Sequence, residues 1–132
     1  ERYFEEWGVR YEKAMVMDTA QCLAGYPMYI VPTIDVFEGK LYIQTGLKKD
    51  VAKQILANPK VELCAFHQGK WIRVTAKAVH DENVAAETHM LDAFPDLKAM
   101  YQPGDGNTAV FALTEGCAKI ESFTEAPQSY TF

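Results

Sequence analysis

Alternation of apolar and polar positions predicts that most of this chain forms short β-strands. Two pairs of alternating runs are each joined by a tight turn, one at Glu38-Gly39 and the other at Gln68-Gly69. Turns of this length join neighbouring antiparallel strands, so the pattern predicts two hairpins. The runs that form them cover residues 34–37 with 40–45, and residues 61–66 with 71–79.

Other apolar runs predict strands on either side of these hairpins. Residues 14–17 and 28–31 are expected to be two strands separated by a loop, and residues 109–113 and 118–123 are expected to be two closing strands. The tail after residue 123 is polar and ends in Tyr130 and Phe132.

Helical spacing is confined to three segments. Val51 and Ile55 predict a helix over residues 50–57 that Asn58-Pro59 ends. Residues 82–100 predict two short helices interrupted at Pro95, and residues 1–13 predict a short amphipathic helix.

These elements predict a mainly β protein with inserted helices, in one domain over residues 1–132. Six or seven short strands joined mainly by tight turns do not suit a parallel sheet, which needs a crossover after every strand. An antiparallel barrel or curled sheet is therefore expected.

Charge and hydropathy exclude several classes of partner. The 13 Lys and Arg residues against 18 Asp and Glu give a net charge of −5, which disfavours a nucleic-acid binder because contacts to phosphates need a basic face. No apolar run approaches the roughly 18 residues that span a bilayer, and the first residues lack the profile of a signal peptide. We expect no nucleic-acid or membrane partner.

Cysteine and histidine spacing predicts no metal site. Cys22, Cys64 and Cys117 lie far apart without a CxxC pair, which favours reduced thiols in a cytoplasmic protein. Cys64 falls in an apolar alternation and is expected to fill the core. The three histidines also lack the spacing of metal ligands.

A basic segment joins the strand at residues 40–45 to the helix at residues 50–57. It places Thr45 and Gly46 at the strand end and Lys48 and Lys49 before the helix. Free N–H groups of a first helical turn, a glycine that admits close approach and two ammonium groups are compatible with an anion pocket. The spacing alone favours the alternative, in which Asp50 caps the helix and both lysines are solvated.

Arg73 is the second candidate for binding. Strand alternation places Trp71 and Arg73 on the face opposite Ile72 and Val74. A planar guanidinium on this face suits a phosphate or a carbonyl, and the alternative is a cross-strand salt bridge to Glu62. No residue stands out as an acid or base catalyst.

Taken together, the ordered motifs resemble the pyridoxamine 5′-phosphate oxidase-like flavin-binding split barrels over roughly residues 36–132. They are Gly39-Lys40-Leu41-Tyr42-Ile43, Thr45, Lys48-Lys49, Gln54, Asn58-Pro59-Lys60-Val61-Glu62 and Gly69-Lys70-Trp71-Ile72-Arg73-Val74. The later segments Phe94-Pro95-Asp96-Leu97-Lys98-Ala99-Met100-Tyr101, Asp105-Gly106 and Ser122-Phe123 are similar to the nitroimidazole-resistance (Nim-type) branch.

The resemblance implies a six- to seven-stranded antiparallel split barrel that forms a homodimer and binds FMN at the interface. It implies that Lys49, with Lys48, Gly46 and Thr45 beside it, binds the FMN phosphate, and that Trp71 and Arg73 line the flavin site. The implied activity is an FMN-dependent oxidoreductase acting on a small oxidised substrate, with a nitro compound as one candidate.

The chain departs from this family in its second strand. Relatives commonly carry arginines there, whereas Pro27-Met28-Tyr29-Ile30-Val31-Pro32 has no cation. Two alternatives therefore stay open: a haem- or flavin-binding protein without turnover, with His67 or His80 as an iron ligand, and a cofactor-free dimer that serves as an interaction module.

Overall fold

The computed structural model describes residues 15–17, 29–30 and 33–132, so the helix expected over residues 1–13 lies outside the described part. The strands are β1 (Met15–Met17), β2 (Tyr29–Ile30), β3 (Thr33–Phe37), β4 (Lys40–Gly46), β5 (Lys60–His67), β6 (Lys70–Asp81), β7 (Thr108–Ser122) and β8 (Gln128–Thr131). The helices are α2 (Asp50–Ala57), α3 (Val84–Ala93) and the 3-10 helix η1 (Pro95–Ala99).

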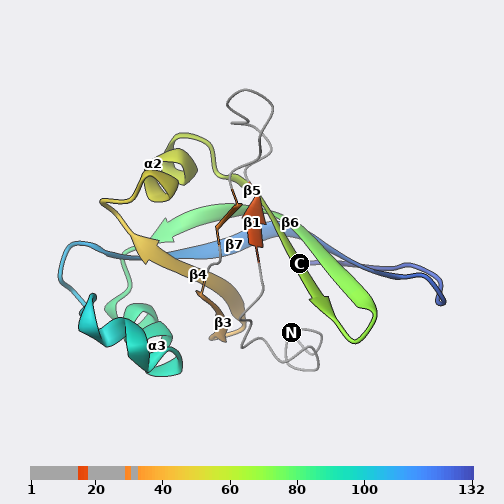
Figure 1. The fold of residues 1–132 in the computed structure, drawn as a ribbon. Coiled ribbons are helices and arrows are strands. Elements are labelled where there is room, and N and C mark those ends of the chain that lie inside the picture. Colours follow the sequence, from red (N-terminus) through yellow and green to blue (C-terminus); the bar gives the residue numbers. More distant parts are fainter. Residues whose placement is uncertain (1–14, 18–28, 31–32) are drawn as a thin grey trace.

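All the described strands belong to one antiparallel sheet. Its order is β2-β1-β5-β6-β7-β4-β3, and β8 pairs with β7. The strongly curved sheet carries α2 and α3 near one end, while the β5–β6 and β7–β8 turns project at the other (Figure 1). The expected fold class, a mainly β antiparallel split barrel with inserted helices, is confirmed, but the described sheet has eight strands where six or seven were expected.

Both predicted hairpins form with the expected turns. Glu38 and Gly39 have φ of 47° and 75°, and Gln68 and Gly69 have φ of 48° and 77°. Two consecutive positive φ angles give the turn whose twist matches antiparallel strands, and glycine takes this conformation without strain. The tight-turn signals in the sequence therefore identified β3–β4 and β5–β6 correctly.

The two expected closing strands are instead one strand, β7, with a bulge in its middle. Thr75 and Lys77 of β6 pair with Cys117 and Thr114 of β7, so β7 carries one extra residue at this point. Glu115 within the bulge has φ of 49°, and Glu115-Gly116 therefore bends the strand without ending it. The tail adds β8, which was not expected because its four residues have no apolar alternation.

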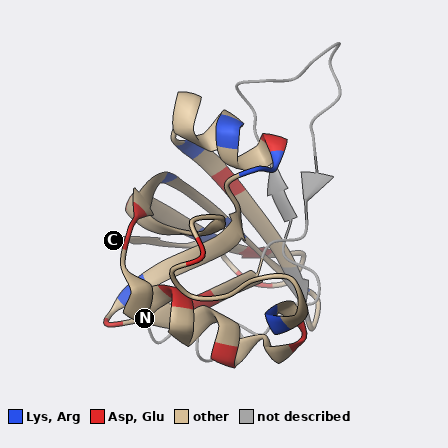
Figure 2. Ribbon diagram, turned by 90° about the vertical axis from the view of Figure 1, so that its left-hand side faces the viewer, with Lys and Arg blue, Asp and Glu red and all other residues tan. Residues whose placement is uncertain are grey.

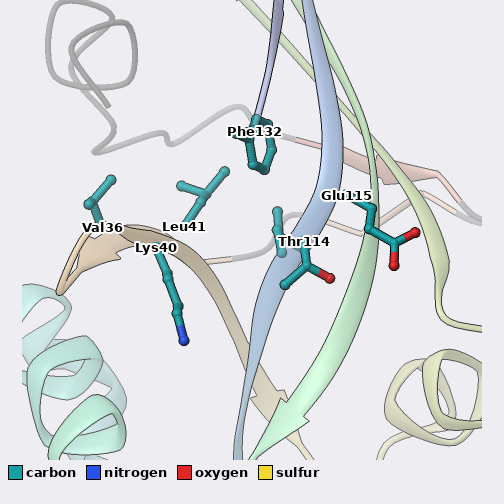
Figure 3. A pocket seen from close by; sticks show the side chains of 8 residues that line it. Val36, Lys40, Leu41, Thr114, Glu115 and Phe132 are labelled. Atoms are coloured by element: carbon teal, nitrogen blue, oxygen red, sulfur yellow. The ribbon is translucent and has the colours of Figure 1, made fainter.

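The strands β4 and β8 share one edge of β7 and leave a gap between them. β4 pairs with residues 108–112 and β8 with residues 117–120. A cavity of about 240 Å³ lies beside this gap, lined by the β3–β4 hairpin, residues 113–115 and Phe132 (Figure 3). The Phe132 ring occupies the space where Gly116 lacks a side chain, so even a methyl group there would displace the ring.

Two apolar clusters hold the helices to the sheet. Ala52 and Ile55 of α2 pack into the larger cluster, on the inner face of the curved sheet. Ala86 and Met90 of α3 pack against Tyr42 in the smaller cluster, on the other side of β4 and β7. The helix over residues 50–57 is confirmed, and so are two helical segments interrupted at Pro95, the second of them a 3-10 helix.

A loop between η1 and β7 is organised by one carboxylate. Asp105 accepts hydrogen bonds from the backbone N–H groups of Gln102 (3.0 Å), Asn107 (2.8 Å) and Thr108 (2.6 Å), and from the Thr108 hydroxyl (3.0 Å). These bonds favour the charged form and lower the pKa of Asp105 to about 2, the bond from the Thr108 N–H contributing most. The ionised carboxylate therefore holds the loop in shape.

We predict that Asp105→Asn lowers the free energy of unfolding at pH 7 by about 1–2 kcal/mol, because the bonds are charge-assisted but exposed to solvent. A depressed pKa in the folded state stabilises the protein fully above the unfolded value of 3.8, and this contribution is lost as the pH falls toward about 2. Urea unfolding at pH 7, 4 and 2 measures the effect.

The exposed Asp96→Asn is the matched control, because no hydrogen bond of the Asp96 carboxylate is found among the described residues. Between pH 4 and pH 2 the loss of stability is expected to be smaller in Asp105→Asn than in the parent or the control. Parallel pH profiles for the three proteins would contradict the role of Asp105.

Candidate functional site

The candidate site is the connection between β4 and α2, residues 45–50, which we call the elbow. The Lys49 N–H donates to the Gly46 carbonyl at 2.9 Å and closes a tight turn directly after β4. α2 then begins at Asp50, with Lys49 as its N-cap residue and no side chain capping the helix. The Ala52 N–H donates to the Lys49 carbonyl at 3.1 Å, and the two N–H groups before it in the first turn of α2 keep their partial positive charge available to an anion.

Asp50 does not cap α2, so this part of the alternative interpretation is wrong. Asp50 is the first helical residue, and its carboxylate lies 3.2 Å from the Lys53 ammonium group, one turn further along. Both side chains are largely exposed, so the pair contributes little stability. Lys53 therefore partly offsets the charge of Asp50, the carboxylate nearest to the elbow.

Lys48 and Lys49 are both exposed, and Lys49 has an aromatic contact. The Lys49 ammonium group lies 5.9 Å from the centre of the Tyr101 ring, a weak cation–π distance that orients the side chain. Basic positions lie just before and within the upper helix, α2, beside an acidic one at its start, whereas the lower helix, α3, carries acidic positions (Figure 2). The positive charge of the site is therefore local.

The elbow is held in place by Asn107, a residue that the sequence analysis did not single out. The Leu47 N–H donates to the Asn107 carbonyl at 2.7 Å, and the Lys48 N–H donates to its side-chain oxygen at 3.1 Å. Gly46 packs closely here, because a Cβ would lie 3.0 Å from Tyr101 and 3.3 Å from Asn107. The sequence signal for this brace is Asp105-Gly106-Asn107, whose aspartate fixes the loop that presents Asn107.

Thr45 is half-buried in β4, where it pairs with Ala109. Strand alternation puts its side chain on the same face as Ile43, toward the inner cluster. Thr45, Gly46, Lys48 and Lys49 thus all lie in the elbow, as their adjacency in the sequence requires.

Arg73 and Trp71 lie on the outer face of β6, as the alternation predicted. The Arg73 Nε lies 3.0 Å from a Glu62 carboxylate oxygen, which is the cross-strand salt bridge of the alternative interpretation. The adjacent Cys64 side chain and the Glu62 carboxylate raise the pKa of Arg73. Trp71 donates its Nε1 proton to Glu121 at 2.8 Å, and its ring meets the edge of Phe123 at 5.1 Å between centroids.

Within one chain, the elbow and the Trp71–Arg73 pair are far apart. Gly46 pairs with Thr108 of β7, whereas Arg73 pairs with Lys119. This difference of 11 residues along β7 corresponds to roughly 36 Å of strand. The two groups of candidate residues therefore form two separate places on a single chain.

Cys64 is not a core residue. Leu63 and Ala65 of β5 point inward, so Cys64 points outward beside Arg73 and is only half-buried. His80 packs its ring against Phe111 at 5.3 Å between centroids, while the side chain of His67 lies outside the described part. Among the described residues no cluster of His, Cys, Asp and Glu suits a metal ion, and no helix there is long and apolar enough to cross a bilayer.

No protein-family model and no curated protein matches the chain, but solved structures do. A NimC/NimA family protein from Clostridium acetobutylicum superimposes with a TM-score of 0.85 at 28% identity, over 99% of this chain and 90% of that one.

Two more distant structures share the fold. One is a C. acetobutylicum protein of the pyridoxinephosphate oxidase family, related to general stress protein 26, with a TM-score of 0.73 at 12% identity over 100% of this chain and 96% of that one. The other is a haem-binding protein from Mycobacterium smegmatis, with a TM-score of 0.66 at 14% identity over 95% of this chain and 55% of that one. The chain thus has the split-barrel fold of these proteins and is similar to a NimC/NimA family protein.

Proposed function

We infer that the protein binds FMN and acts as a flavin-dependent oxidoreductase on a small oxidised substrate, with a nitro compound as one candidate. The observation that carries this proposal is the elbow, where two exposed lysines precede a helix whose N-terminus no side chain caps. The likeness to a NimC/NimA family structure supports the same class of protein.

The residues of the elbow fit a phosphate group. A phosphate dianion needs fixed cations together with N–H donors, and Lys48, Lys49 and the first turn of α2 supply both. Asn107 holds the Leu47 and Lys48 amides, so the turn is shaped before any ligand arrives. Preorganisation of this kind lowers the entropic cost of binding.

Bound FMN supplies the redox chemistry, and the protein binds and orients it. In the proposal Lys49 and Lys48 bind the phosphate, with the Gly46 backbone and the Thr45 hydroxyl beside it. Trp71 and Arg73 line the ring, and the small substrate binds against it. No acid or base catalyst is assigned.

The proposal includes a homodimer with FMN at its interface. The elbow and Arg73 lie at opposite ends of β7, so residues of one chain do not enclose one ligand between them. A second copy that brings its Trp71 and Arg73 to the first copy's elbow completes the site. The charged Arg73 then has to bind the ring while Glu62 stays beside it.

We predict that Lys48→Ala combined with Lys49→Ala weakens FMN binding by about 10- to 150-fold, the equivalent of one charge-assisted contact to phosphate. Riboflavin, which has the same ring without the phosphate, is expected to bind the variant and the parent equally. Quenching of flavin fluorescence in titrations measures both affinities.

The control is Lys60→Ala combined with Lys98→Ala, which removes two exposed lysines outside the elbow. It should leave FMN affinity unchanged. Equal weakening of FMN by the two double variants would show a general charge effect, and equal weakening of FMN and riboflavin by the first would place the phosphate elsewhere.

A second prediction tests the shared site by complementation. Arg73→Gln is expected to weaken both FMN and riboflavin, because it acts on the ring. When this variant and the lysine double variant are unfolded together and refolded as an equal mixture, half of the dimers combine the two chains. One site in each such dimer has both intact parts, so about one quarter of all sites should regain the parent's FMN affinity.

Calorimetric titration of the refolded mixture measures the fraction of high-affinity sites, and each variant refolded alone is the control. A mixture without high-affinity sites would overturn the shared site.

A haem-binding protein without turnover is the alternative, favoured by the shared fold of the M. smegmatis protein. The colour of the purified protein separates the two functions. Yellow protein that releases FMN on denaturation supports the proposal, whereas red-brown protein with a Soret band supports haem. A Soret band lost in His80→Ala or His67→Ala would identify the iron ligand.

A further inference from the structure

The side chain of Gln44 lies near the elbow, and the proposed function gives it no role. Gln44 of β4 is only 5% exposed, and neither its amide nitrogen nor its amide oxygen has a hydrogen-bond partner among the described residues. Buried side-chain amides are nearly always hydrogen-bonded, because they lose their bonds to water on burial. Gln44 therefore lowers the stability of the ligand-free protein.

The position of Gln44 connects it with the elbow. Tyr42, Gln44 and Gly46 alternate onto the same face of β4. Tyr42 lies in the cluster beneath α3, and Tyr101 covers Gly46 at the elbow. Gln44 thus lies between an apolar cluster and the lysine pair, roughly 7 Å along the strand from Gly46.

The neighbours of Gln44 do not satisfy its amide. The Tyr42 hydroxyl donates to Asp81 at 2.8 Å, and the Thr33 hydroxyl points to the backbone carbonyl of Gln44 at 3.4 Å. Val110, the partner of Gln44 on β7, is apolar and fully buried. The two N–H donors and the carbonyl oxygen of the amide therefore remain unused in an apolar setting, where a hydrogen bond is strong.

We propose that Gln44 binds the hydrogen-bonding edge of a planar heterocycle whose phosphate is held at the elbow. A primary amide presents an N–H and a carbonyl side by side, and this pair complements the N–H and carbonyl of a lactam or imide ring. The isoalloxazine ring of FMN has such an edge, so this inference rests on the proposed function and adds a specificity residue to it. Because Gln44 is 5% exposed, this contact requires that the neighbours covering its amide shift when the ring binds.

The test is Gln44→Leu, a substitution of similar volume without polar atoms. Because it removes an unsatisfied amide, the ligand-free variant is expected to have a Tm roughly 3–6 °C above that of the parent. Because it also removes the ring contacts, its affinities for FMN and for riboflavin are both expected to fall about tenfold. Calorimetric unfolding and flavin fluorescence titrations measure the two effects.

The control is Gln54→Leu, which changes a half-buried glutamine of α2 and should leave both affinities unchanged. If Gln44→Leu binds riboflavin as tightly as the parent, Gln44 does not bind the ring, and the inference is overturned while FMN binding stands. A Tm lower than the parent's would also overturn it, by showing a structural partner. If the parent itself binds neither FMN nor riboflavin, the proposed function fails, and the inference about Gln44 that rests on it is overturned with it.

Discussion

The pairing of β7 on both of its edges is the constraint on which the rest of the structure depends. One edge of β7 pairs with β6 on both sides of the bulge, and the other pairs first with β4 and then with β8. Such pairing satisfies backbone groups that would be costly to bury alone. It also fixes the elbow at one end of the sheet and Arg73 near the other, so the geometry of any site follows from this strand.

Local signals predicted the elements that depend on local chemistry. Asn58-Pro59 ends α2 where the sequence indicated, and the glycines at positions 39 and 69 allow the left-handed turns of both hairpins. The continuity of β7 was not predictable in the same way, because Glu115-Gly116 has the composition of a turn. β8 was missed because its pairing with β7 is set by the edge that the rest of the sheet leaves open.

In the candidate site, too, the residues that are adjacent in sequence were predictable, and the contacts between distant residues were not. The lysines and the glycine of the elbow are adjacent in sequence, so their motif was visible. The Asn107 brace joins backbone to side chain across 59 residues, and no periodicity reports such a contact. Arg73 shows the opposite limit, since alternation gave its face correctly but did not decide between Glu62 and a ligand. Because Arg73 forms a salt bridge with Glu62, binding measurements have to decide whether it also contacts a ligand.

The bulge at Glu115-Gly116 divides the molecule into two halves whose sequences can change independently in evolution. The half with α2, α3 and the elbow is built on residues 108–112 of β7, and the projecting half is built on residues 117–120. Loop lengthening or altered side chains at the projecting turns would leave the elbow intact. The sequence of the projecting end can therefore diversify in evolution while the geometry of the elbow is retained.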